Sequence, residues 1–270
     1  MSMDGKDSIK DLRHTDMSPL FDRVAGEYHA TAPEAPPEYC QLIIRQHSLG
    51  RGTRVVELGC GSGALSRQLA SYGLQVYGVD SSREFLKIAR EQDKDGSVEW
   101  VHAFAEEYVP EGGQVDLVLA HEAFHLFTRK EQIVQNAATI LRPRGAIAVG
   151  WCEYHWELAL RDCIISTFQS FGIDWGEWGY QQCREFDDLI LANPTAFGSC
   201  RVVSTRVHQQ TLVDGVAGLL ASIGKAAQLD SEVRTKLRCS LMQEFRQKFG
   251  SSQMSGSSTY WLRTAIRKNG

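Results

Sequence analysis

No segment of this sequence is apolar for long enough to cross a bilayer as a helix, which takes about 20 consecutive apolar residues. The first ten residues, MSMDGKDSIK, also lack the apolar stretch of a secretory signal. The sequence therefore carries no sign of membrane insertion or secretion. We expect a cytoplasmic protein with no membrane partner.

Excess positive charge is absent as well. The 29 lysines and arginines are outnumbered by 33 aspartates and glutamates, the net charge is −4, and no long basic run occurs. Proteins that bind nucleic acid carry basic patches that neutralise phosphates. The charge balance therefore argues against nucleic acid as a substrate or partner.

The cysteines form no framework. The seven cysteines are odd in number and widely spaced, and no two are arranged as C-x-x-C. A disulfide scaffold or a zinc site would need paired spacing. We therefore expect small buried thiols and no bound metal.

The most informative segment that is present is VVELGCGSG, residues 55–63. Its apolar half predicts a strand, its glycines a tight turn, and the pattern from Ala64 onward a helix. Such a turn lets bare backbone approach a ligand, and the first N–H groups of the helix supply donors. A second predicted strand ends at Asp80, twenty-one residues after Gly59, where a carboxylate can accept both hydroxyls of a ribose. The segment predicts a nucleoside-cofactor site.

Two cofactor classes fit glycines of this kind. Gly59, Gly61 and Ala64 match the dinucleotide fingerprint, so an NAD-dependent oxidoreductase stays an alternative. Glu57 and Gly63 favour another class, because a carboxylate at the end of the first strand repels a pyrophosphate but suits a ligand with an ammonium group. The pattern E-x-G-x-G-x-G followed by Asp resembles the class I S-adenosylmethionine (SAM) dependent methyltransferases. The resemblance implies SAM as the cofactor.

The resemblance continues on both sides of the turn and is to small-molecule enzymes of the trans-aconitate methyltransferase type. Residues 21–39 resemble an N-terminal helix that folds over the cofactor, residues 102–127 the third and fourth motifs, and residues 141–151 the next turn and fifth strand. By this likeness, the cofactor-binding residues are Tyr28, Glu57, Gly59, Gly61, Asp80, Ser81, Ala105, Glu106 and His121.

Strand and helix patterns alternate along the first 150 residues, which is typical of a parallel sheet with right-handed crossovers. Strands are predicted near 53–58, 75–79, 98–102, 115–120, 145–150, 200–212 and 258–268, and helices near 64–72, 82–92 and 129–141. The helix at 82–92 should begin with a capping box of Ser81 and Glu84. The expected fold class is α/β: a doubly wound, Rossmann-like, mixed seven-stranded sheet with helices on both faces. A helical, aromatic cap is inserted after the fifth strand.

The same pattern predicts four regions of the chain. An N-terminal helical segment, 1–50, covers the cofactor, and the SAM-binding core is 51–151. A cap or substrate-binding insertion follows at 152–199. The late strands occupy 200–270, with an inserted helical part of the cap.

One motif points elsewhere. His121, Glu122 and His125 spell H-E-x-x-H, which on a helix holds zinc in a metalloprotease. Here the motif directly follows a predicted strand, and Thr128 and Glu131 stand where the metzincin extension needs Gly and His. A protease is therefore disfavoured. In the methyltransferase interpretation the end of the fourth strand faces the transferred methyl group. The catalytic candidates are then His125, as first candidate base, and Glu122, since either type can take a proton from a hydroxyl.

The segment after residue 151 is expected to form the acceptor pocket, because it is rich in aromatic residues. These residues are Trp151, Tyr154, Trp156, Phe168, Phe171, Trp175, Trp178 and Tyr180. For any single one of them, a place in the core of the cap is the alternative. The substrate-binding candidates are Trp151, Glu153 and His155, after the fifth strand, and Ser222, whose segment resembles the family's late helical region.

The expected function is transfer of the SAM methyl group to a small-molecule acceptor by in-line displacement, at the oxygen of a hydroxyl or a carboxylate. The fourth strand is not followed by Asn or Asp with Pro-Pro-aromatic, a signature that resembles DNA and protein-glutamine N-methyltransferases. Two alternatives stay open: the NAD-dependent oxidoreductase, and a methyltransferase-like protein that binds SAM without transferring methyl.

Overall fold

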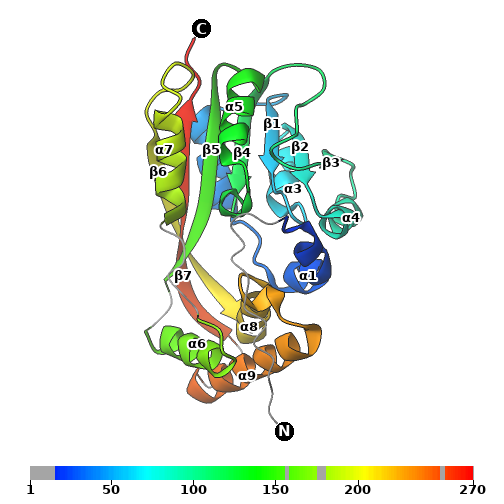
Figure 1. Ribbon diagram of the computed structural model, residues 1–270, viewed down its shortest axis with the longest axis vertical. Helices are drawn as coiled ribbons and strands as arrows, with labels where there is room; N and C mark the ends of the chain where they lie inside the picture. The colour runs from blue at the N-terminus through cyan, green and yellow to red at the C-terminus, as the bar shows by residue number, and fades with distance from the viewer. Residues whose placement is uncertain (1–15, 156–157, 175–180, 250–252, 270) are drawn as a thin grey trace.

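The computed structural model describes residues 16–155, 158–174, 181–249 and 253–269. Within these residues a seven-stranded sheet has the order β3-β2-β1-β4-β5-β7-β6 (Figure 1). The strands are β1 (Arg54–Leu58), β2 (Gln75–Asp80), β3 (Val98–His102), β4 (Val115–His121), β5 (Leu141–His155), β6 (Arg201–Leu212) and β7 (Gln253–Ile266).

The sheet is mixed. β1 to β5 are parallel, so that Val56 of β1 pairs with Tyr77 of β2 on one side and Val118 of β4 on the other. β7 runs antiparallel to both of its neighbours, β5 and β6. The predicted fold class is confirmed. Because the strand order reverses between β1 and β4, the carboxyl ends of these two strands open a crevice in which ligands of such sheets bind.

Helices lie between the strands and before the first strand. They are α1 (Ser18–Thr31), α2 (Pro37–His47), α3 (Ala64–Ser71), α4 (Arg83–Gln92), η2 (Phe124–Leu126), α5 (Lys130–Ile140), α6 (Leu158–Ser170), α7 (Gln181–Leu191), α8 (Val213–Ser222), η3 (Ala226–Gln228) and α9 (Ser231–Phe249). The predicted helices at 64–72, 82–92 and 129–141 match α3, α4 and α5 within two residues.

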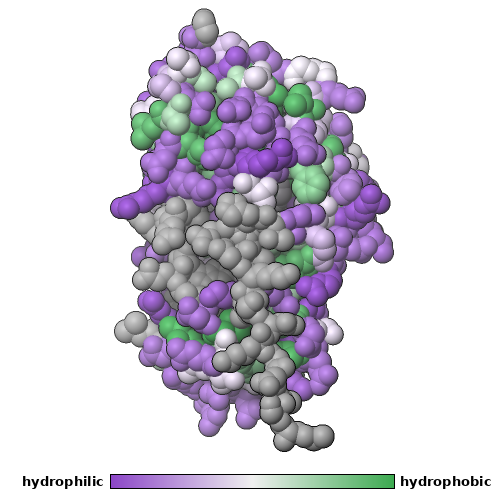
Figure 2. All heavy atoms as spheres, viewed as in Figure 1, coloured by the Kyte–Doolittle hydropathy of each residue, from purple (hydrophilic) through white to green (hydrophobic). Residues whose placement is uncertain are grey.

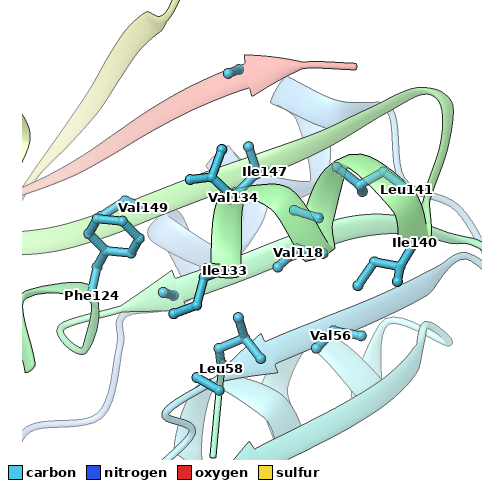
Figure 3. Packing of buried hydrophobic residues seen from close by; sticks show 14 of the residues in the cluster. Val56, Leu58, Val118, Phe124, Ile133, Val134, Ile140, Leu141, Ile147 and Val149 are labelled. Carbon is cyan, nitrogen blue, oxygen red and sulfur yellow. The ribbon is translucent and has the colours of Figure 1, made fainter. Parts of the chain in front are cut away.

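Each face of the sheet has its own apolar core. On one face, Ile133 and Val134 of α5 pack over Val56, Val118 and Ile147 of the strands (Figure 3). The α7 residues Phe186 and Ile190 belong to the same cluster. On the opposite face, α2 and α3 cover alternate strand residues, including Val55, Leu117, Leu119 and Ala148. Successive side chains of a strand point to opposite faces, so only site residues on the same face of the sheet can contact each other.

The cap is built at the far end of two long strands. β5 reaches His155 rather than the predicted residue 150, because it stays paired with β7 as far as Ser257. Beyond this point α6, α8 and α9 lie together at the end of the molecule opposite α5 (Figure 1). Phe168, Leu237 and Phe245 are among the buried side chains of their cluster. The expected cap segment 152–199 is thus divided, with α6 in the cap and α7 on the sheet beside α5.

The side of the molecule shown in Figure 2 is mainly hydrophilic over the described residues, and hydrophobic residues show there in small separate groups. None of the helices in the described residues combines the length and apolar character that crossing a membrane requires. The six cysteines whose side chains are described are all free.

Candidate active site

The glycine turn has the predicted form. Gly59, Gly61 and Gly63 have φ angles of 69°, 55° and 79°, values that side chains disfavour. A Cβ on Gly61 would meet no atom within 4 Å, so its backbone faces open space. A ligand can approach the bare peptide at this point.

Asp80 is oriented by this turn. Its Oδ2 accepts a hydrogen bond from the Gly61 N–H at 2.8 Å, and its Oδ1 accepts one from the Ser82 N–H at 2.8 Å. Burial raises the pKa of Asp80, while these two bonds oppose that shift. The carboxylate is thus fixed at the carboxyl end of β2 with lone pairs left for further donors, as ribose recognition needs.

The predicted capping box of Ser81 and Glu84 is wrong. The N-cap of α4 is Ser82, whose Oγ accepts from the Phe85 N–H at 3.1 Å. Because β2 includes Asp80, the chain needs one more residue before the helix begins. Ser81 instead accepts a hydrogen bond at 2.8 Å from the hydroxyl of Ser18, at the start of α1.

Glu57 lies within the protein. Its side chain accepts a hydrogen bond from the Ser66 hydroxyl of α3, and only 3% of the residue is exposed. Burial raises the pKa of Glu57 to about 7, although the Ser66 bond opposes the shift. The carboxylate is therefore enclosed between β1 and α3, and its interaction with a ligand ammonium group stays a prediction.

Glu57→Gln should make the protein relatively more stable as the pH rises. A native pKa of about 7, above an ordinary 4.5, means that Glu57 contributes stability below pH 4.5 and loses it as the pH rises through 7. Glutamine cannot ionise and still accepts from Ser66. We expect the free energy of unfolding of the variant, relative to the unaltered protein, to rise by about 3 kcal/mol between pH 4.5 and pH 8.

Urea unfolding across this pH range measures the difference. The exposed Glu38→Gln serves as the control and should show no such trend. A difference between Glu57→Gln and the unaltered protein that is constant with pH would contradict the burial of an ionisable carboxylate at Glu57.

The predicted adenine pair, Ala105 and Glu106, is buried. Glu106 Oε1 accepts from the N–H groups of Thr128 and Arg129 at 2.9 Å and 3.2 Å. Although burial opposes it, these bonds hold the pKa of Glu106 below its usual value. The carboxylate thus anchors the loop before α5. A contact of this pair with adenine stays a prediction.

The H-E-x-x-H motif does not lie on one helix. His121 ends β4, and Glu122 has a left-handed φ of 54°. The Glu122 N–H donates to the Gly150 carbonyl at 2.9 Å, and its Oε1 accepts from the Cys152 N–H, so Glu122 is joined to β5 twice. Among the described residues, no three potential ligand side chains come together as a metal site would need. The zinc-protease interpretation therefore lacks its helix.

His121 belongs to a ring stack on the α2 face of the sheet. Its ring centroid lies 4.8 Å from that of Tyr39 and 6.2 Å from that of Tyr260. A Cβ on Gly150 would lie 1.9 Å from the Tyr39 hydroxyl oxygen, so only glycine admits this ring. Burial lowers the pKa of His121 to about 4, which makes its imidazole neutral at pH 7.

The charge of Glu122 acts on five residues, which together with it we call the tyrosine cluster. It consists of Glu122, Tyr28, Tyr39, Cys152, Tyr154 and Tyr260. Burial raises the pKa of each of the other five, and the negative charge of Glu122 raises it further. Glu122 is exposed to solvent, yet desolvation by the surrounding protein raises its own pKa to about 7. The cluster combines one carboxyl group with several neutral donors.

His125 lies away from this cluster in its described contacts. It occupies the short helix η2, and burial together with Lys130 lowers its pKa to about 4. Lys130 forms an ion pair with Glu185 of α7, 3.0 Å long, on the other face of the sheet. Of the two predicted catalytic residues, the geometry therefore favours Glu122.

Trp151, Glu153 and His155 share the face of β5 opposite to Cys152 and Tyr154. Trp151 stacks on Trp261 with centroids 6.0 Å apart, and Glu153 accepts from the Trp261 indole N–H at 3.1 Å. His155 is 2.7 Å from the hydroxyl of Thr259. The structure does not bring these three predicted substrate residues to the tyrosine cluster, and their contact with an acceptor stays a prediction.

The remaining predicted acceptor residues are separate from the cluster in their described contacts. Ser222 is buried at the end of α8, where its hydroxyl donates to the Leu219 carbonyl at 2.9 Å. Phe168 and Phe171 belong to the core of the cap. Trp156, Trp175, Trp178 and Tyr180 lie outside the described residues.

Sequence reasoning missed Tyr39 and Tyr260. They come from α2 and β7, and only the strand register, in which Cys152 pairs with Tyr260, brings the second to the site. The sequence signal for Tyr260 was its place within the strand predicted at 258–268.

Helix α1 joins the cofactor side of the site to the cap (Figure 1). Toward α4, Asp22 accepts from the Ser82 hydroxyl at 2.6 Å, and the Tyr28 ring meets Phe85 edge-on at 5.5 Å. Toward the cap, Glu27 accepts two hydrogen bonds, 3.0 Å and 3.1 Å long, from the guanidinium of Arg234 on α9. The helix is thus held from both ends of the site.

Comparison with known proteins agrees with this geometry. Residues 56–149 match the family described as "Methyltransferase domain". A ubiquinone biosynthesis O-methyltransferase of Aromatoleum aromaticum is 33% identical over 135 residues, which are 47% of this chain and 58% of that protein. The chain spans about half the length of the curated relatives it matches.

Two solved structures show the same fold. A proposed type II methyltransferase from Anaeromyxobacter dehalogenans has a TM-score of 0.63 at 18% identity, over 87% of this chain and 97% of that one. Phosphoethanolamine N-methyltransferase 2 of Haemonchus contortus, in complex with SAM, has a TM-score of 0.57 at 15% identity, over 94% and 60%. With the open backbone at Gly61 and the oriented Asp80, residues 56–149 form a class I, SAM-dependent methyltransferase domain.

Proposed function

We propose that the protein transfers a methyl group from SAM to the oxygen of a small-molecule acceptor. The observation that carries this proposal is the position of Tyr28, whose pKa burial and the charges of both Glu122 and Asp80 raise to about 12. The carboxylates at the ends of β2 and β4 therefore both lie near the Tyr28 hydroxyl. This proximity supports a single site made of the glycine turn and the tyrosine cluster.

The residues divide the work of such a site. SAM supplies, when bound, a methyl group on a sulfonium, which is open to attack by a nucleophile. Asp80 and the Gly61 backbone would hold its ribose and methionine side, and Tyr28 would cover them. The tyrosine cluster would orient the acceptor and exclude water, while Glu122 would take the acceptor's proton.

Two further observations support a small acceptor and an oxygen atom. The relative from Aromatoleum aromaticum is named an O-methyltransferase of ubiquinone biosynthesis. Helix α1, which carries Tyr28, packs against α8 of the cap (Figure 1), and a site closed in this way suits a compact molecule better than a nucleic acid. The net charge of −4 also gives no attraction for phosphates.

An assay with tritiated-methyl SAM tests the proposal. The protein is incubated with a panel of phenols, carboxylic acids and amines, and the product is identified by mass. Label in an oxygen-methylated product is expected. SAM that binds in calorimetry but is never consumed would indicate a SAM-binding protein without transfer, and binding of NADH in place of SAM would indicate an oxidoreductase.

A further inference from the structure

We propose that the acceptor presents an uncharged hydroxyl group to Glu122, which removes its proton, and that this site rejects acceptors carrying a carboxylate there. The inference rests on the proposed function and narrows it to one substrate class. In the step, the O–H bond of the acceptor breaks and its proton passes to Glu122. The acceptor oxygen forms the new O–CH₃ bond as the S–CH₃ bond breaks, and that electron pair stays on the sulfur of the S-adenosylhomocysteine released.

The first support is how Glu122 is held. Its backbone is joined to Gly150 and its Oε1 to the Cys152 N–H, so the carboxylate is fixed between the end of β4 and residues 150–152 of β5. Among the described residues Oε2 has no hydrogen-bond donor, and the side chain is exposed. One carboxylate oxygen is therefore positioned and the other is available to a ligand.

The second support is the charge around Glu122. The titratable groups around Glu122 are Tyr28 of α1, Tyr39 of α2, His121 of β4, Cys152 and Tyr154 of β5, and Tyr260 of β7. Two further carboxyl groups act on members of this group: Asp80 on Tyr28, and Glu57 on Tyr39. The tyrosines, the thiol and the imidazole are neutral at pH 7, so the groups that carry charge here are carboxyl groups. No described lysine or arginine contributes to the pKa shift of Glu122 or of Tyr28.

An acceptor carboxylate would therefore approach like charge with no compensating cation. Two charges about 5 Å apart in a medium of effective dielectric constant about 20 repel by an amount worth on the order of 100-fold in affinity. A neutral hydroxyl meets no such repulsion. It can donate to Glu122 and accept from a tyrosine hydroxyl, since the cluster offers both kinds of partner.

The chemistry favours a hydroxyl over an amine as well. An amine must lose its proton before its nitrogen can attack, and an adjacent carboxylate stabilises the protonated form. A hydroxyl must lose its proton to something, and a base is most effective when its pKa approaches that of the group it deprotonates. Desolvation by the surrounding protein raises the pKa of Glu122 to about 7, which is nearer to that of a phenol than the pKa of an ordinary carboxylate.

A binding experiment with matched ligands tests the proposal. The protein, loaded with S-adenosylhomocysteine, is titrated by calorimetry with 2-naphthol and with 2-naphthoate at pH 8 and pH 6. At pH 8 we expect 2-naphthol to bind at least about tenfold more tightly than 2-naphthoate. At pH 6, Glu122 takes up a proton and the preference should fall severalfold.

Two variants locate the effect. Glu122→Gln keeps an acceptor for the Cys152 N–H but has no charge, so it should lose the preference and its pH dependence. Glu107→Gln, at an exposed surface ion pair with Arg129, should keep both. Unchanged affinity for S-adenosylhomocysteine in each variant shows that the fold is intact.

The outcomes separate the two proposals. Equal affinity for the two ligands in the unaltered protein, including no detectable binding of either, overturns the inference, as does a preference that survives in Glu122→Gln. In a parallel assay with tritiated-methyl SAM, label on 2-naphthoate or on 2-naphthylamine rather than on 2-naphthol also overturns it. If 2-naphthol is preferred in a way that depends on Glu122, but no acceptor is labelled, the proposed methyl transfer is contradicted and the inference about the acceptor group stands.

Discussion

Asp80→Ala is expected to weaken SAM binding by at least about 100-fold. An ionised group that accepts hydrogen bonds from both ribose hydroxyls contributes about 1.5–3 kcal/mol for each bond. Alanine removes both bonds. It also removes the acceptor that Gly61 and Ser82 share, so the turn beside the cofactor loses a support. Calorimetric titration with SAM measures the loss.

Asp80→Asn should not rescue binding. Both carboxylate oxygens accept from backbone N–H groups, and an amide would turn its own NH₂ toward one of these donors. The exposed Asp95→Ala is the matched control and should bind SAM as the unaltered protein does. An affinity of Asp80→Ala within threefold of the unaltered protein would remove Asp80 from ribose recognition.

Glu27→Ala is expected to destabilise the protein by about 2–4 kcal/mol and to weaken SAM binding as well. Arg234 is 4% exposed, and its guanidinium donates to both carboxylate oxygens of Glu27. Removing Glu27 leaves a buried charge without its partner, which is costly. Because the same helix carries Tyr28, a loosened α1 should also weaken the cover over the cofactor. Urea unfolding and SAM calorimetry measure the two effects.

The partner variant should be milder. Arg234→Met leaves Glu27, whose side chain is 46% exposed, free to rehydrate, and methionine refills much of the volume. Glu232→Ala, at the exposed pair with Lys236, should change stability little. If Glu27→Ala and Arg234→Met prove equally destabilising, the buried charge is not the source of the effect.

The cofactor half of the site could be predicted because its signals are local. The glycine turn and Asp80, at the end of the next strand, lie within the 26 residues from Glu57 to Ser82. Their chemistry follows from local backbone geometry. Even here the sequence missed that Glu57 is turned toward Ser66. A buried carboxylate and one facing a ligand have the same sequence signature.

The acceptor half could not be predicted in the same way. Trp151, Glu153 and His155 lie within β5 rather than after it. Side chains alternate between the faces of a strand, so residues adjacent in sequence lie on opposite sides of the sheet. The side that faces Glu122 carries Cys152 and Tyr154. Tyr260 joins them through the pairing of β5 with β7, a contact between segments about a hundred residues apart. No local pattern encodes such a register.

The position of α1 between α4 and the cap has a thermodynamic consequence. The conformational entropy lost when this helix is ordered is lost once, whichever ligand arrives first. A cofactor that orders α1 through Tyr28 therefore lowers the entropic cost of ordering the cap, which α1 contacts through Glu27. By linkage, an acceptor bound first would raise cofactor affinity by the same factor. The two ligands can thus bind cooperatively through one shared helix, in addition to their own contact at the methyl group and without any change in the shape of the sheet.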